Sequence, residues 1–256
     1  AAEEPAAEEP AAEEPAAAAE GKYKESPVLA AKVAAGELPP VDERLPEEPM
    51  VVGPGTYLTE ENLPNWEPGV YGGTLRSAHA VANWSPDIFV MLDEPLVMAP
   101  KIGDQGIVGA VVKEFTVEND NKDFTFVLRK GLKWSDGEPV TTEDVRFTYE
   151  NILLNEKINP IFPAKFRNGF KADEEPMTLE VVADYTFKVH FTKPYGGFLR
   201  ALAIEGWVGY TDLINPSHYL KQWHADYADI NSDAFKAEYE RLNLTDEWWQ
   251  VFAQKR

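Results

Sequence analysis

The sequence contains no cysteine among its 256 residues. This excludes disulfide bonds and cysteine-ligated zinc sites within the chain. It also has no apolar run that approaches the roughly 18 residues of a membrane-spanning helix. Basic residues are scarce, with 24 Lys and Arg against 44 Asp and Glu and a formal net charge of −20. Because nucleic acids and anionic membranes bind clustered cations, neither is expected as a direct partner, and we expect the acidity to serve solubility.

Motifs for catalysis and metal binding are missing as well. The four histidines form no His-Glu-x-x-His motif, so a surface or hydrogen-bonding role is expected for His79, His190, His218 and His224. Gly72-Gly73 lacks the residues that would continue a phosphate-binding loop, and no Gly-x-Ser-x-Gly motif occurs. Acidic neighbours are frequent, but paired catalytic carboxylates require a spacing that a sequence does not show. We therefore expect no enzymatic activity, no cofactor and no metal.

The first 20 residues are a low-complexity tail. They repeat Ala-Ala-Glu-Glu-Pro three times before Ala-Ala-Ala-Ala-Glu. Pro5, Pro10 and Pro15 each remove a backbone donor, and the runs between them are shorter than the roughly 12–15 residues that an isolated helix needs. Residues 1–20 are thus expected to be a disordered, charge-extended linker. Such a linker could lift a folded domain off a surface, or it could have no role.

Residues 21–70 form a second region, a proline-rich extension. One short amphipathic helix is predicted at 26–35, with Pro27 in its first turn and Gly36 at its end. The frequent prolines beyond it favour an extended chain that wraps over a surface.

At 256 residues, the chain has room for one large or two small domains.

The remaining chain, residues 71–256, is predicted to be a mixed α/β structure. A first core strand is expected at 72–76, and residues 88–97 resemble a helix-to-strand element of a known family that is named below. Alternating apolar residues and turn signals predict two hairpin-like strand pairs, at 114–117 with 124–128 and at 179–181 with 185–191. The chain between these pairs, at 159–170, is expected to be irregular. Helical spacing, caps and breakers predict helices at 141–153, 198–203, 217–223, 234–242 and 245–252.

The stretch LRKGLKWSDGEPVTTEDVRFTYE, residues 128–150, gives the most specific signal. It combines a strand end, an Asp-Gly turn, an extended Pro139 link and a helix capped by Thr141 or Thr142, with Asp144 placed as in a capping box. This stretch resembles the signature of the family 5 extracellular solute-binding proteins of ABC importers, which bind peptides, nickel complexes or oligosaccharides. Residues 23–52 are similar to the N-terminal extension of a subgroup that includes proteins thought to take oligosaccharides as well as peptides. The signature contains no catalytic residue.

The resemblance implies a fold and a mode of action. It implies the first lobe of a type II periplasmic-binding-protein fold, with an insertion-like subdomain near residues 98–192 and a second lobe that would follow residue 256. It further implies an exported monomer at the periplasmic or extracellular face of the cell membrane. There it would capture an oligopeptide or oligosaccharide and deliver it to ABC permease subunits. Family members are often lipoproteins, so a lipid anchor before the linker is implied by the resemblance alone.

Two aromatic-containing stretches are the candidate ligand-binding region. Aromatic platforms suit sugar faces and peptide side chains, although ordinary core packing is the alternative for each ring. The polar loop after the first strand and the segment EGWVGYTD supply the candidates, which are His79, Asn83, Trp84, Asp87, Trp207 and Tyr210. A second function stays open, namely a sensory or surface interaction protein built on the same scaffold. Neighbouring genes for a permease and an ATPase would favour transport, and a neighbouring receptor or kinase would favour sensing.

Overall fold

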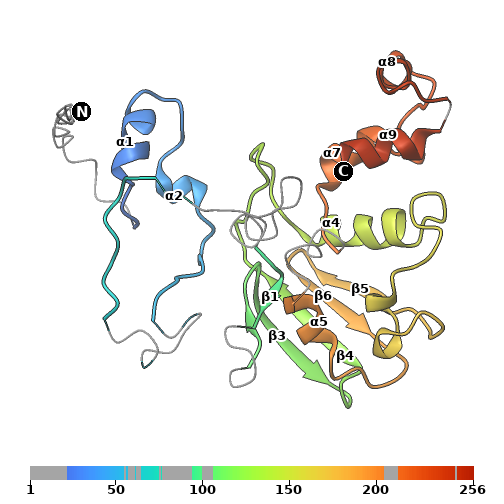
Figure 1. Ribbon diagram of the computed structural model, residues 1–256, viewed down its shortest axis with the longest axis horizontal. Helices are drawn as coiled ribbons and strands as arrows, with labels where there is room; N and C mark the ends of the chain where they lie inside the picture. Colours follow the sequence, from blue (N-terminus) through green and yellow to red (C-terminus); the bar gives the residue numbers. More distant parts are fainter. Residues whose placement is uncertain are drawn as a thin grey trace, which may run out of the picture. The chain divides into compact units, whose positions relative to one another are not determined.

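The computed structural model describes residues 22–54, 56, 61, 65–74, 76, 94–99, 106–204, 213–245 and 247–256. The chain divides into two compact units (Figure 1). One comprises residues 1–45 and 67–77, and the other comprises residues 46–66 and 78–256. The expected disordered tail, residues 1–20, lies outside the described residues.

The first unit contains two short helices, α1 (Pro27–Ala34) and α2 (Val41–Arg44). The predicted start and end of α1 are confirmed, because the Ser26 side chain caps it and Gly36 follows with φ of 73°. No residue of either helix is buried, so α1 does not bury an apolar face. The extended conformation expected after α1 is wrong at α2. The carboxylate of Asp42 in α2 instead accepts hydrogen bonds from the backbone N–H groups of Lys22 and Tyr23, each at 2.9 Å.

The strand expected at 72–76 is also wrong for the residues described there. Residues 71–74 and 76 adopt no strand conformation. Gly72 and Gly73 have φ values of 120° and 73°, which lie outside the range of a strand. These two glycines therefore take conformations that a regular strand does not contain.

A four-stranded antiparallel sheet organises the second unit. Its strands run in the order β3 (Val112–Glu118), β4 (Asp123–Leu128), β6 (Thr186–His190) and β5 (Thr178–Ala183), which confirms both predicted strand pairs. A smaller pair, β1 (Val97–Met98) and β2 (Val108–Gly109), accompanies it. The β3–β4 turn has positive φ at Asn119, Asp120 and Asn121, a conformation that Asn and Asp tolerate better than most residues. The second unit is therefore the mixed α/β structure that the sequence predicts.

One face of this sheet forms the larger hydrophobic core, which we call the sheet cluster. Strand alternation buries Phe124 and Phe126 of β4 together with Phe187 and Val189 of β6, all at most 1% exposed. Helix α5 (Phe198–Ile204), predicted at 198–203, covers this face, and its Phe198 ring lies 5.0 Å from the Phe124 ring centre. Residues on the opposite face, such as Thr125 and Lys188, remain partly exposed.

The predicted helix after Pro139 is present as α4 (Thr142–Phe147), which continues without a break as the π-helix η2 (Thr148–Leu153). The buried residues of this helix belong to two different hydrophobic cores. Val145 and Leu153 pack into the sheet cluster, whereas Phe147 and Ile152 pack into a second core, which we call the helical cluster. Figure 1 shows α4 between the sheet and helices α7 and α9.

The helical cluster is completed by the C-terminal elements α7 (Ser217–Leu220), the 3₁₀ turn η6 (Lys221–Trp223), α8 (Asp233–Leu242) and α9 (Trp248–Lys255). The irregular stretch predicted at 159–170 contains two 3₁₀ turns, η3 (Ala164–Phe166) and η4 (Asn168–Phe170). Two details of the predictions are wrong. Ser217 does not cap α7, because Pro216 holds the cap position, and α9 begins at Trp248 rather than at 245.

Candidate functional site

The six predicted ligand-binding residues lie outside the described part of the structure. They are His79, Asn83, Trp84, Asp87, Trp207 and Tyr210, so their role stays a prediction. The described residues that flank the two stretches nevertheless share one location. Leu96 and Val97 follow the first stretch, α5 precedes the second, and Leu213 and Ile214 follow it. All of these flanks belong to the sheet cluster, and α5 packs against β1. One core thus holds the segment that follows the first stretch and both flanks of the second.

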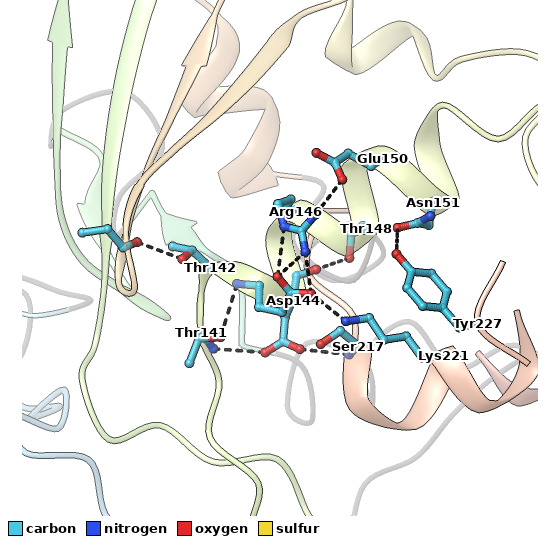
Figure 2. A network of polar contacts seen from close by, with 12 residues as sticks. Thr141, Thr142, Asp144, Arg146, Thr148, Glu150, Asn151, Ser217, Lys221 and Tyr227 are labelled. Carbon is cyan, nitrogen blue, oxygen red and sulfur yellow. Dashed lines mark hydrogen bonds and ion pairs between the residues drawn. The ribbon is translucent and has the colours of Figure 1, made fainter.

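The best-defined polar site within the described residues is a network around Asp144 (Figure 2). This residue is only 2% exposed, and its carboxylate accepts three N–H groups from separate segments. The donors are the Thr141 backbone at 3.0 Å, the Trp134 indole at 3.1 Å and the Ser217 backbone at 2.9 Å. The contact with Thr141 completes the predicted capping box. Because a buried carboxylate needs such donors, Asp144 ties the helix start, the preceding turn and α7 together.

Two threonines of the same helix extend the network in different directions. The Thr142 hydroxyl donates to the Ala183 carbonyl at 2.8 Å, which links α4 to the turn between β5 and β6. The Thr148 hydroxyl donates to the Asp144 carbonyl at 2.6 Å and accepts from the Asn215 amide at 3.3 Å. Both threonines are at most 2% exposed. The helix is therefore fastened to the sheet by one threonine and to residue 215 by the other.

Charged side chains on the surface beside this network form what we call the charged seam, which comprises Glu143, Arg146, Lys221, His218 and Asp136. Glu143 accepts from Arg146 of its own helix and from the Lys221 ammonium group at 2.6 Å. Burial alone would raise the pKa of Glu143, but the hydrogen bonds from Lys221 and Arg146 outweigh it and lower the pKa below its usual value. His218 pairs with Asp136 at 2.7 Å, and this contact lowers the pKa of the Asp136 carboxyl.

The residues of the 128–150 stretch thus bind the protein's own chain. Arg129 donates to the carbonyl groups of Ala110 at 2.7 Å and Glu48 at 2.9 Å. A side chain on Gly131 would meet the Glu47 backbone nitrogen at 3.1 Å, and the φ of Gly131 is 84°, so glycine suits this close approach. Trp134, Asp136 and Asp144 make the contacts described above. The contacts described for this stretch are therefore internal ones that hold the scaffold together.

The polar groups described here offer little for chemistry. A shallow crevice of about 220 Å³ lies beside Thr141, Arg146 and Asp184. Two of its polar side chains, Glu143 and Arg146, pair with each other. Within the described ranges no three His, Asp or Glu side chains cluster as metal ligands. His190 lies on the outer face of its strand as predicted, while His224 is hydrogen-bonded but fully buried rather than on the surface.

Sequence reasoning missed how far the network reaches. It placed Asp144 in a capping box, but the contacts with Trp134 and Ser217 join residues that lie 10 and 73 positions away in the chain. The contact between Trp134 and Asp144 has a local signal, because the Trp-Ser-Asp-Gly turn lies close to Asp144 in the sequence. No local signal marks Ser217 or Asn215 as partners of the helix.

A comparison with protein families decides the classification. The model for bacterial extracellular solute-binding proteins, family 5, matches residues 106–246, which is more than half of the chain. The chain belongs to this family. The matched range contains the whole sheet and the Asp144 network, so the predicted resemblance is confirmed.

Individual relatives agree with the family. The periplasmic alpha-galactoside-binding protein of Rhizobium meliloti is 30% identical over 90% of this chain and 34% of its own length. A solved structure of the oligopeptide-binding protein OppA superposes with a TM-score of 0.71 at 32% identity, over 91% of this chain and 32% of that one. The structure of MelB from Agrobacterium fabrum in complex with stachyose gives a TM-score of 0.59 at 28% identity, over 82% of this chain and 32% of that one.

These superpositions confirm a periplasmic-binding-protein-like fold for this family member. The chain spans about a third of the length of these relatives. Among the described residues, no helix has the length and apolar composition needed to cross a bilayer.

Proposed function

We propose that this chain is the first lobe of an extracytoplasmic solute-binding component of an ABC importer. It captures an oligopeptide or oligosaccharide at the periplasmic or extracellular face of the membrane and delivers it to permease subunits. The observation that carries the proposal is the family match over residues 106–246. The use of the 128–150 stretch as internal scaffold supports it, because a binding lobe needs a rigid frame and no catalytic group.

The mechanism follows from two lobes that close around the solute. Each lobe supplies one wall, and closure buries most of the ligand. In this proposal His79, Asn83, Trp84, Asp87, Trp207 and Tyr210 form the wall of the first lobe. The shared anchoring of their flanks in the sheet cluster supports a common location for the two stretches. The protein acts as a monomer and makes no covalent change to its ligand.

Three relatives suggest the probes. One is named for alpha-galactosides and another was solved with stachyose, whereas OppA is named for oligopeptides. Calorimetric titration with stachyose and with a mixture of tri- to pentapeptides separates the two classes. The protein used in the titration should contain the second lobe as well as residues 1–256. Saturable binding of either probe supports solute capture, and binding of neither contradicts it.

Substitution tests the proposed site. Trp84→Ala or Trp207→Ala should weaken ligand binding by about 1–3 kcal/mol, the scale of losing an aromatic anchor. Trp249→Ala is the matched control, since Trp249 packs beside the helical cluster and stacks with Lys157. This control should lower the melting temperature while the affinity is unchanged. If Trp84→Ala and Trp207→Ala behave like the control, the two residues are core residues and the proposed site is wrong.

The two-lobe mechanism has its own test. Residues 1–256 alone should bind the same probe at least ~100-fold more weakly than the extended chain, a loss of about 2.7 kcal/mol. The physical reason is that a single lobe leaves one side of the ligand hydrated. Equal affinities would show that the site is complete within residues 1–256 and that closure adds nothing.

A further inference from the structure

His224 is the one fully buried histidine among the described residues, and neither the scaffold nor the proposed ligand site uses it. It follows η6 and has 0% exposure. Aromatic rings surround it, with centroid distances of 4.7 Å to Trp248, 5.6 Å to Phe252, 5.7 Å to Tyr227 and 6.0 Å to Phe147. These rings come from α4, α9 and the segment after η6, so the imidazole lies where the helical cluster joins α4.

The hydrogen bonds of His224 fix its neutral tautomer. Nδ1 lies 3.2 Å from the backbone nitrogen of Asp226, which can only donate, so Nδ1 accepts. Nε2 lies 3.1 Å from the Asn151 carbonyl oxygen, which can only accept, so Nε2 carries the proton. The side-chain amide of Asn155 lies 3.3 Å from the same nitrogen. Both nitrogens are therefore engaged without a positive charge.

A second proton would have to go on Nδ1, which now accepts a hydrogen bond. On Nδ1 it would face the N–H of Asp226, so the bond that fixes the turn after His224 would be lost. The charged groups nearby are few. The Asp226 carboxylate lies 3.7 Å from Nδ1, and the Lys221 ammonium group stacks on Phe147 and Tyr227. The described contacts from α4, η2 and α9 to the imidazole are uncharged.

We propose that His224 is a pH-sensitive switch that releases the helical cluster from the α4–η2 helix when the imidazole is protonated. The described buried members of the sheet cluster include no histidine, carboxylate or amine side chain, so this cluster has no comparable group that takes up a proton near pH 6. Acid would thus loosen residues 217–255 while the sheet and the start of α4 remain folded. This device is independent of the identity of the ligand.

The direction of the pH dependence follows from burial. Burial lowers the pKa of His224 below its usual 6.5, although the Asn151 carbonyl and the Asp226 carboxylate oppose this effect. An opened state exposes the imidazole and takes up a proton near pH 6.5, whereas the closed state takes it up only at lower pH. The closed state is therefore fully favoured above pH 6.5 and loses its advantage as the pH falls below that value.

Amide hydrogen exchange of this chain at pH 8.0 and pH 5.5, corrected for intrinsic rates, tests the switch. Amides in α7, η6 and α9 should exchange severalfold faster at pH 5.5 relative to those in β4 and β6, because only the open state readily takes up the proton at this pH. His224→Gln should remove this pH dependence. His190→Gln is the matched control; it removes the Asp123 hydrogen bond between the reference strands β4 and β6, but it should leave the pH dependence of exchange in α7, η6 and α9 themselves intact.

A second variant keeps the test decisive if His224→Gln fails to fold. Asp226→Asn retains the imidazole and removes the carboxylate that favours its protonation, so the acid sensitivity of α7, η6 and α9 should increase. Equal pH dependence of the helices and the strands in the unmodified chain would overturn the proposal. A smaller or unchanged sensitivity in Asp226→Asn would overturn it as well.

Discussion

The sheet cluster and the helical cluster share one helix but are built in different ways. The sheet cluster consists of apolar side chains that alternate along paired strands, and its phenylalanine rings pack against α5. The helical cluster joins short helices around His224 and is fastened to α4–η2 through polar atoms of Asp144, Glu143 and Asn151. The comparison teaches that regular strand pairing and apolar packing hold the first cluster, whereas the second depends on side-chain hydrogen bonds between distant segments and on ionisation.

The largest expected difference comes from removing one fully buried ring from each cluster. Phe126→Ala should destabilise the protein by about 3–5 kcal/mol, because its ring stacks on Phe187 at 5.1 Å in the middle of the sheet. Phe235→Ala removes the one buried residue of α8 and should free that helix without unfolding the sheet. Thermal unfolding followed by circular dichroism measures both variants. Equal losses of melting temperature would show that the two clusters are one cooperative core.

Disruption of the Asp144 network should cause the next largest loss in the free energy of unfolding. Asp144→Ala leaves the buried N–H groups of Ser217, Trp134 and Thr141 without their acceptor, so a loss of about 3 kcal/mol is expected. Thr142→Val is the control from the same first turn of α4, since it removes one hydroxyl and should cost about 1–2 kcal/mol. Urea unfolding gives both values. A smaller loss for Asp144→Ala than for Thr142→Val would contradict the central place of Asp144.

Acid should act on the sheet later than on the helices. His190 donates to Asp123 across β4 and β6, and this hydrogen bond lowers the pKa of Asp123 below its usual 3.8. Because the folded-state pKa is lowered, the stabilisation is present above pH 3.8 and disappears as the pH falls through the folded value. Asp123→Asn should therefore reduce the loss of melting temperature between pH 4 and pH 2. An unchanged acid profile would show that this pair contributes nothing to the sheet.

The smallest effect is expected on the charged seam between the clusters. Lys221→Met removes the ion pair with Glu143, in which the two side chains are 29% and 38% exposed. Partly exposed ion pairs contribute little, so the loss should be about 0.5 kcal/mol and should shrink further in high salt. A salt-independent loss of more than about 2 kcal/mol would mean that the seam, rather than the buried Asp144, holds α7.

Local patterns predict most of the sheet cluster. The alternation of Phe124, Phe126 and Leu128, the turn at 119–121 and the capping box at Thr141 are short-range signals, and each is confirmed. The strand expected at 72–76 fails because paired glycines permit a bend as readily as an extended chain.

The helical cluster could be predicted only in part. Its helices have local signals, but their attachment depends on contacts such as Asp144 with Ser217, which are distant in sequence. The burial of His224 also follows from this tertiary packing, and nothing in its neighbouring residues indicates it. The candidate ligand residues, such as Trp84 and Trp207, lie outside the described residues and stay predictions.

The most direct test compares two neighbouring positions on the shared helix. Val145 faces the sheet cluster and Phe147 faces the helical cluster, and both are at most 1% exposed. We predict that Val145→Ala accelerates amide exchange mainly in β4 and β6, and that Phe147→Leu accelerates it mainly in α7, η6 and α9. If both variants accelerate the same set of amides to the same extent, the division of the second unit into two differently held clusters is wrong.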